Sequence, residues 1–132
     1  MSEKYTEVDE YLKTLIGTEK DWVEFFVNYM RKNHSDLEEV ISFKMPTYKL
    51  GSGKLRNYIA FSPAKNHFSM HSMDFEYISL LKEELKKPGK GKGCVNVPYG
   101  NEAERSILID GIDKIISRNV LKTYGKKDNI GV

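Results

Sequence analysis

Two histidines and one cysteine are the residues whose spacing decides whether they could bind a metal ion together. His67 and His71 are four residues apart, and Cys94 is the only cysteine of the 132-residue sequence. On a helix, this spacing would bring both imidazoles to one face, where they could share a metal ion. On a strand, it separates them by about 13 Å, too far for one ion. A metal site would then need one histidine together with Cys94 or a carboxylate.

The segment before Cys94 alternates glycine with lysine. Residues 89–93 read Gly-Lys-Gly-Lys-Gly, and such a loop can hold an anion through its backbone N–H groups. It lacks the pattern of a nucleotide-binding P-loop, so a flexible connection is the alternative. A reactive thiol needs a nearby cation to lower its pKa. Lys92 would share a strand face with Cys94, but no histidine is assured beside them, and we therefore expect a structural cysteine.

Acidic side chains gather near the N-terminus. Residues 1–40 carry ten acidic and five basic side chains, and residues 41–132 carry nine and sixteen. Glu7, Asp9 and Glu10 could bind a hard cation such as iron, because such cations prefer oxygen ligands. The alternative is an acidic helix face in contact with solvent.

Composition excludes several classes of protein. The net charge of +2 does not indicate a nucleic-acid-binding protein, and exposed aromatics are not interleaved with basic residues. No apolar run is long enough to cross a membrane, and the first residues do not resemble a leader peptide. No serine–histidine–acid, HExxH or dinucleotide pattern is present. We therefore expect a cytoplasmic protein that is not an enzyme.

Periodicity predicts four helical segments. Apolar residues recur every three or four positions over residues 6–15, from Thr18 through Tyr29, over 75–86 and from Asn101 to 119. Thr18 with Asp21, Asp74 and Asn101 are the expected N-caps. Ser35 and Glu38 form a capping-box pattern that predicts a further short helical turn from Asp36. The tail after Tyr124 is polar and is expected to fray.

Alternation predicts the strands. Residues 41–50 form a strand in which Pro46 marks a bend, a bulge or an edge. Residues 51–54 form a hairpin turn, and residues 55–62, 67–72 and 93–98 form three more strands. One sheet face should meet the core through Ile59, Phe61, Phe68, Met70, Val95 and Val97. The opposite face should carry Tyr58, Ala60, His67, Ser69, His71, Cys94 and Asn96. The fold class is therefore α+β, with an antiparallel sheet of about four to five strands and helices packed on one face.

The middle of the chain resembles a known family. Residues 39–50, EVISFKMPTYKL, are similar to the first strand segment of YdhG-like domains, the domain-of-unknown-function family 1801. LRNYIAF, KNHFSMH and GKGCVNV follow in the family's order, as does the closing helix. The likeness covers residues 5–120 and implies one YdhG-like domain over residues 1–132. The lysine-rich segment over residues 86–92 and a longer loop after the third strand depart from the family's pattern.

The resemblance implies iron as a candidate ligand, because one bacterial member is described as a frataxin-like intracellular iron chaperone. It carries no catalytic residue to this chain. We expect a small ligand or a metal to bind in a groove on the helix-free sheet face, with iron as the only candidate cofactor. The groove candidates are Met45, Tyr48, Tyr58, His67, His71, Lys92, Cys94 and Asn96. The metal candidates are Glu7, Asp9, Glu10, His67 and His71. The alternative is an interaction or scaffold domain, such as a homodimer, that uses the same face.

Overall fold

The computed structural model describes residues 6–51 and 57–131, with side chains as far as Asn119. Its elements are α1 (Thr6–Leu12), α2 (Gly17–Asn33), β1 (Glu38–Ser42), β2 (Met45–Lys49), β3 (Tyr58–Pro63), β4 (His67–Ser72), α3 (Phe75–Lys82), β5 (Cys94–Pro98) and α4 (Glu102–Gly131). The five strands form one sheet in chain order, and every neighbouring pair is antiparallel. The predicted α+β class is confirmed.

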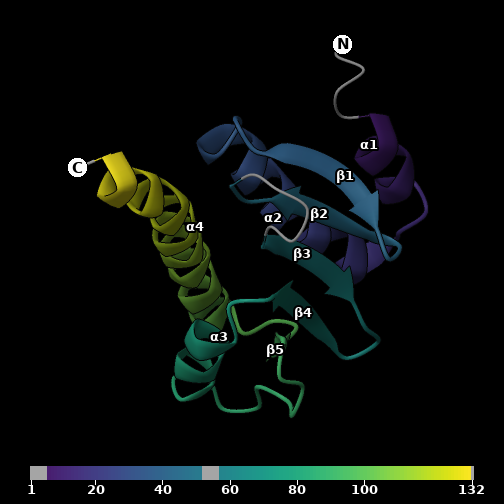
Figure 1. Ribbon diagram of the computed structural model, residues 1–132. Coiled ribbons are helices and arrows are strands. Elements are labelled where there is room, and N and C mark those ends of the chain that lie inside the picture. The colour runs from purple at the N-terminus through teal and green to yellow at the C-terminus, as the bar shows by residue number, and fades with distance from the viewer. Residues whose placement is uncertain (1–5, 52–56, 132) are drawn as a thin grey trace.

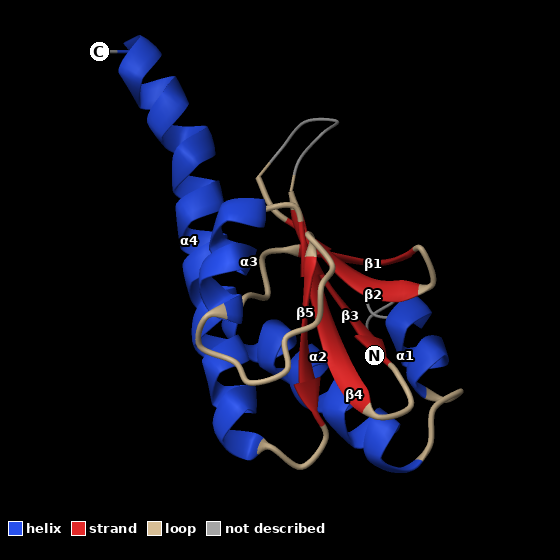
Figure 2. Cartoon of the chain, turned by 90° about the horizontal axis from the view of Figure 1, so that it is seen from below, coloured by secondary structure: helices blue, strands red, loops and turns tan. Residues whose placement is uncertain are grey.

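The helices pack against one face of the sheet. Figure 1 looks onto the opposite, helix-free face, with α2 behind the strands. Helix α2 contacts β3 and β4, whereas α3 and α4 contact each other, and α3 also contacts β5. Seen from below in Figure 2, α4 runs past α3 and projects beyond it. We call the helix-free face the outer face.

The predicted core face is confirmed. Its six strand residues, Ile59, Phe61, Phe68, Met70, Val95 and Val97, are fully buried. They lie on one face because side chains alternate along a strand and paired residues share a face. Helix α2 covers them with Phe26, whose ring lies 4.4 Å from that of Phe68 in a stacked pair.

The short helical turn predicted from Asp36 is wrong. Glu38 begins β1 instead and pairs with Lys49 of β2. The capping-box pattern is local, whereas the two β-branched residues Val40 and Ile41 gain a partner strand. Sheet pairing therefore overrides the weaker helix signal.

The prediction of a single strand over residues 41–50 is also wrong. Ser42 pairs with Met45, so a two-residue turn at Phe43 and Lys44 joins β1 to β2. Both turn residues have positive φ, 51° and 64°, as in a type I′ turn. Phe43 is 85% exposed instead of half-buried. Apolar and polar residues continue to alternate through the turn, so the sequence pattern does not reveal it.

The turn predicts a stabilising double substitution. Phe43→Asn with Lys44→Gly supplies residues that tolerate positive φ, which costs other residues about 1–3 kcal/mol each. We expect the free energy of unfolding in urea to rise by about 1–2 kcal/mol, less than the strain removed because glycine also gains freedom in the unfolded chain. Phe43→Pro should instead destabilise the protein, because proline fixes φ near −65°. A rise in the free energy of unfolding of this variant would contradict the turn geometry.

Several helix bounds differ from those predicted. Helix α1 ends at Leu12 and α3 at Lys82, each earlier than expected, whereas α4 continues to Gly131 past the expected fraying point. The cap of α2 is Ile16, one residue before the helix begins at Gly17, and not Thr18. Beyond Leu12 and Lys82 the chain continues in turns in which an N–H binds the carbonyl three residues earlier, as Leu15 does to Leu12 and Leu85 to Lys82. Helix ends often tighten in this way.

The other two predicted caps are in place. Asp74 accepts a hydrogen bond from the Tyr77 N–H, and Asn101 accepts one from the Glu104 N–H. Three apolar residues within the predicted helical segments, Phe25, Phe75 and Ala103, are exposed. Of the predicted hairpin turn over residues 51–54 only Gly51 is described, and the first residues of the predicted strand 55–62 also lie outside the described residues.

Candidate functional site

The outer face brings polar residues of three strands together. His71 of β4 pairs with Ala60 of β3 on one side and with Cys94 of β5 on the other. Two residues earlier on β4, Ser69 pairs with Ser62 of β3 and with Asn96 of β5. We call Ser62, Ser69, His71, Cys94 and Asn96 the His71 cluster.

Two short hydrogen bonds hold the cluster. The Ser62 Oγ and His71 Nε2 are 2.9 Å apart, and the Ser69 hydroxyl donates to Asn96 Oδ1 at 2.6 Å. Both bonds cross between strands, so they fix the positions of these side chains on the outer face. Ser69 is buried, and the other four members are half-buried.

The imidazole of His71 is held neutral. Burial lowers its pKa below the ordinary value of 6.5, because desolvation disfavours the charged form. Near pH 7 the neutral ring therefore carries a proton on one nitrogen and a lone pair on the other. This is the form that accepts a hydrogen bond or binds a metal.

The lowered pKa predicts a pH dependence of stability. The unfolded imidazole takes up its proton at a higher pH than the folded one, so stability is lost as pH falls through 6.5 toward the folded pKa. We expect the free energy of unfolding to fall between about pH 7 and pH 5, with a smaller fall in His71→Gln. Urea unfolding at several pH values measures this slope. An unchanged slope in the variant would contradict the assignment.

The other candidate histidine, His67, lies apart from the cluster. His67 pairs with Pro98 at the far end of β4, four residues from His71, so the two stand about 13 Å apart along the strand, as expected from the sequence. Tyr58 and Met45 are also on the outer face, opposite Lys49 and Ser42 respectively. These positions form the rim around the cluster.

Two groove candidates lie elsewhere. Tyr48 pairs with Ile59 and faces the core, where it is 2% exposed and donates a 2.6 Å hydrogen bond to buried Glu39. Its expected place in the groove is therefore wrong. The Lys92 ammonium lies 6.0 Å from the centre of the Phe75 ring, beside α3.

Sequence reasoning missed Ser62 as a site residue. It is two residues beyond Ala60, so alternation alone puts it on the outer face. The missing information was the pairing with β4, which brings its hydroxyl to His71.

The acidic metal candidates engage different partners. Glu7 accepts a 2.9 Å hydrogen bond from the Ile41 N–H, Asp9 pairs with Arg31 at 2.9 Å, and Glu10 pairs with Lys13 at 3.0 Å. Among the described residues, no three His, Cys, Asp or Glu side chains come together as a metal site. Glu7 and Asp9 therefore connect α1 to β1 and α2, whereas the pair of Glu10 with Lys13 is local.

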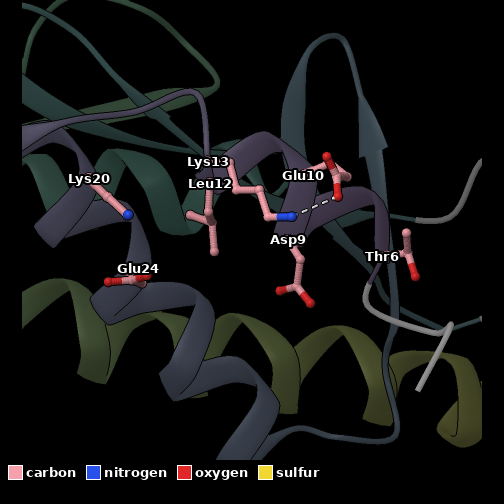
Figure 3. A pocket seen from close by; sticks show the side chains of 7 residues that line it. All are labelled: Thr6, Asp9, Glu10, Leu12, Lys13, Lys20 and Glu24. Carbon is pink, nitrogen blue, oxygen red and sulfur yellow. Dashed lines mark hydrogen bonds and ion pairs between the residues drawn. The ribbon is translucent and has the colours of Figure 1, made fainter. Parts of the chain in front are cut away.

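A shallow groove lies between α1 and α2 (Figure 3). It measures about 380 Å³ and is lined by Thr6, Asp9, Glu10, Leu12, Lys13, Lys20 and Glu24. Figure 3 shows Glu10 turned toward Lys13 across one wall, with Lys20 and Glu24 on α2. Charges of both signs line the groove, and Asp9 and Glu10 are already paired, so we prefer the His71 cluster as the candidate site.

Comparison with known proteins shows the fold. No family model and no curated protein matches the sequence. The crystal structure of YdhG from Bacillus subtilis, a protein of the DUF1801 family, is similar with a TM-score of 0.70 and 16% identity, covering 91% of this chain and 93% of that one. No helix in the described parts of the chain is both long and apolar enough to cross a membrane.

Proposed function

We propose that this chain is a binding protein whose ligand contacts the outer face at the His71 cluster. The observation that carries the proposal is the pairing of His71 with Cys94 across β4 and β5, next to a hydrogen-bonded serine. A catalytic serine–histidine pair also needs a group that orients the imidazole. Among the described residues, Ser62 is the one hydrogen-bond partner of His71, which favours binding over catalysis.

Ferrous iron is the ligand we would test first. Imidazole and thiolate are both iron ligands, and the resemblance to YdhG-like domains points the same way. The Asn96 N–H binds Pro88 and so points away from β4. Amides alternate along a strand, so Cys94 and His71 form a non-hydrogen-bonded pair, with Cα atoms about 4.5 Å apart. Two protein ligands would leave other positions to water and give exchangeable binding.

Anaerobic titration of the metal-free protein with ferrous iron tests this function. We expect one site that His71→Gln weakens by about tenfold or more. His67→Gln is the matched control, because it removes an imidazole from the same strand and face outside the cluster, and it should leave the affinity unchanged. Equal affinity in all three proteins would overturn the proposal.

Self-association through the outer face is the second candidate, and the condition of both sheet edges favours it. Glu7 occupies an edge amide of β1, and Pro88 occupies one of β5. Edge-to-edge pairing is thereby obstructed, which leaves the face as the surface for a second copy. Light scattering should then show a dimer that Tyr58→Glu separates and Lys65→Glu, in an exposed loop, does not. A monomer at every concentration would exclude it.

A further inference from the structure

The segment before β5 lies against one end of the His71 cluster. We call residues 87–93 the strap. In Figure 2 the connection from α3 passes close to β5 before entering it. Two backbone hydrogen bonds tie its ends: the Asn96 N–H donates to Pro88 O at 3.0 Å, and the Ser72 N–H donates to Gly93 O at 2.9 Å. Between these ties, the Lys82 ammonium donates to Gly91 O.

At Gly89 and Gly91 the strap approaches the cluster too closely for a side chain. A Cβ atom on Gly89 would lie 2.4 Å from Asn96 Nδ2, and one on Gly91 would lie 2.6 Å from Cys94 Sγ. Gly89 also has a φ of +83°, which other residues rarely adopt. The glycines therefore allow the strap to lie directly on Asn96 and Cys94.

The strap buries little apolar surface. Its four exposed inner residues are Gly89, Lys90, Gly91 and Lys92, and Pro88 is its only apolar residue apart from glycine. Segments with little buried apolar surface open with a low free energy, independently of the core. The strands beneath, in contrast, carry fully buried valines.

We propose that the strap is a cover that opens locally and uncovers the Cys94–Asn96 end of the outer face. This inference rests on the proposed function of that face, because opening regulates access of a ligand to Cys94. Gly89 and Gly91 act as positioning residues that let the cover close. The core face of β5 keeps its packing in both states.

Hydrogen exchange of neighbouring amides on β5 tests the opening without any ligand. The Asn96 amide is bound by the strap, whereas the Val95 and Val97 amides point to β4 by alternation. We expect Asn96 to exchange at least about tenfold faster than both valines, with a rate that low urea concentrations do not change. Equal protection and equal urea dependence of the three amides would overturn the proposal.

A pair of glycine substitutions tests the close approach. Gly89→Ala should speed Asn96 exchange and the reaction of the Cys94 thiol with a maleimide by about tenfold. Gly100→Ala is the matched control, since Gly100 has a similar φ of +89° but a Cβ atom there would have no atom beyond its chain neighbours within 4 Å. Equal rates in the two variants would contradict the cover. These readouts use no iron, so they stand or fall separately from the iron titration.

Discussion

Replacing Arg31 with Met should lower the free energy of unfolding by about 3–5 kcal/mol, as expected when one partner of a buried ion pair is removed. Arg31 Nε and Nη2 each donate to Glu39 at 2.9 Å, and the Glu39 side chain is 1% exposed. Without the guanidinium, a buried carboxylate keeps only the Tyr48 hydroxyl among these partners. The same arginine also pairs with Asp9, so the substitution removes an ion pair between α1 and α2 as well.

Two further variants isolate the cause of that loss. Lys13→Met breaks an ion pair whose side chains are 72% and 65% exposed, and it should cost less than about 1 kcal/mol. Adding Glu39→Gln to Arg31→Met removes the unpaired charge and should recover part of the lost stability. If Arg31→Met and Lys13→Met proved equal in urea unfolding, the buried pair would not have the importance assigned to it.

Phe26→Ala should cost about 3–5 kcal/mol through the cavity it leaves. The Phe26 ring is fully buried, stacks on Phe68 at 4.4 Å, and lies 5.2 Å from Phe61. Together with Trp22, whose ring lies 5.9 Å from that of Phe68, it packs α2 against the centre of the sheet. Urea unfolding followed by the signal of the lone tryptophan, Trp22, measures the loss.

The neighbouring phenylalanine is a matched control. Phe25 is 38% exposed. The guanidinium carbon of Arg105 lies 3.9 Å from the centre of the Phe25 ring. Phe25→Ala should therefore cost about 1 kcal/mol or less, chiefly the cation–π contact and a partial burial. A loss as large as that of Phe26→Ala would show that the core extends to the outer side of α2.

The sequence predicted the structure best where apolar and polar residues alternate along several strands. Alternation over β3, β4 and β5 identified both sheet faces, and all six expected core residues are buried. It failed at Phe43 and Lys44, because a two-residue turn preserves the alternation on both sides of it. The prediction for Tyr48 failed because it ignored pairing: its partner Ile59 faces the core.

The candidate site could be predicted only in part. Alternation placed His71, Cys94 and Asn96 on one face, but not the contact of His71 with Ser62, which depends on the strand pairing. The position of the strap on Asn96 and Cys94 was also hidden, since glycine–lysine alternation is equally typical of an open loop. Spacing along one strand shows which residues share a face. Which residues become neighbours across strands can be known only from the strand pairing of the folded protein.

The most direct test of the central claim is a ¹⁵N–¹H NMR spectrum of the protein with increasing ferrous iron under anaerobic conditions. Paramagnetic iron broadens the signals of nuclei near its site. We expect broadening to begin at the amides around His71 and Cys94, which pair across β4 and β5. Broadening that begins instead at Glu7, Asp9 and Glu10 of α1, or uniform broadening without a site, would contradict a ligand site on the outer face.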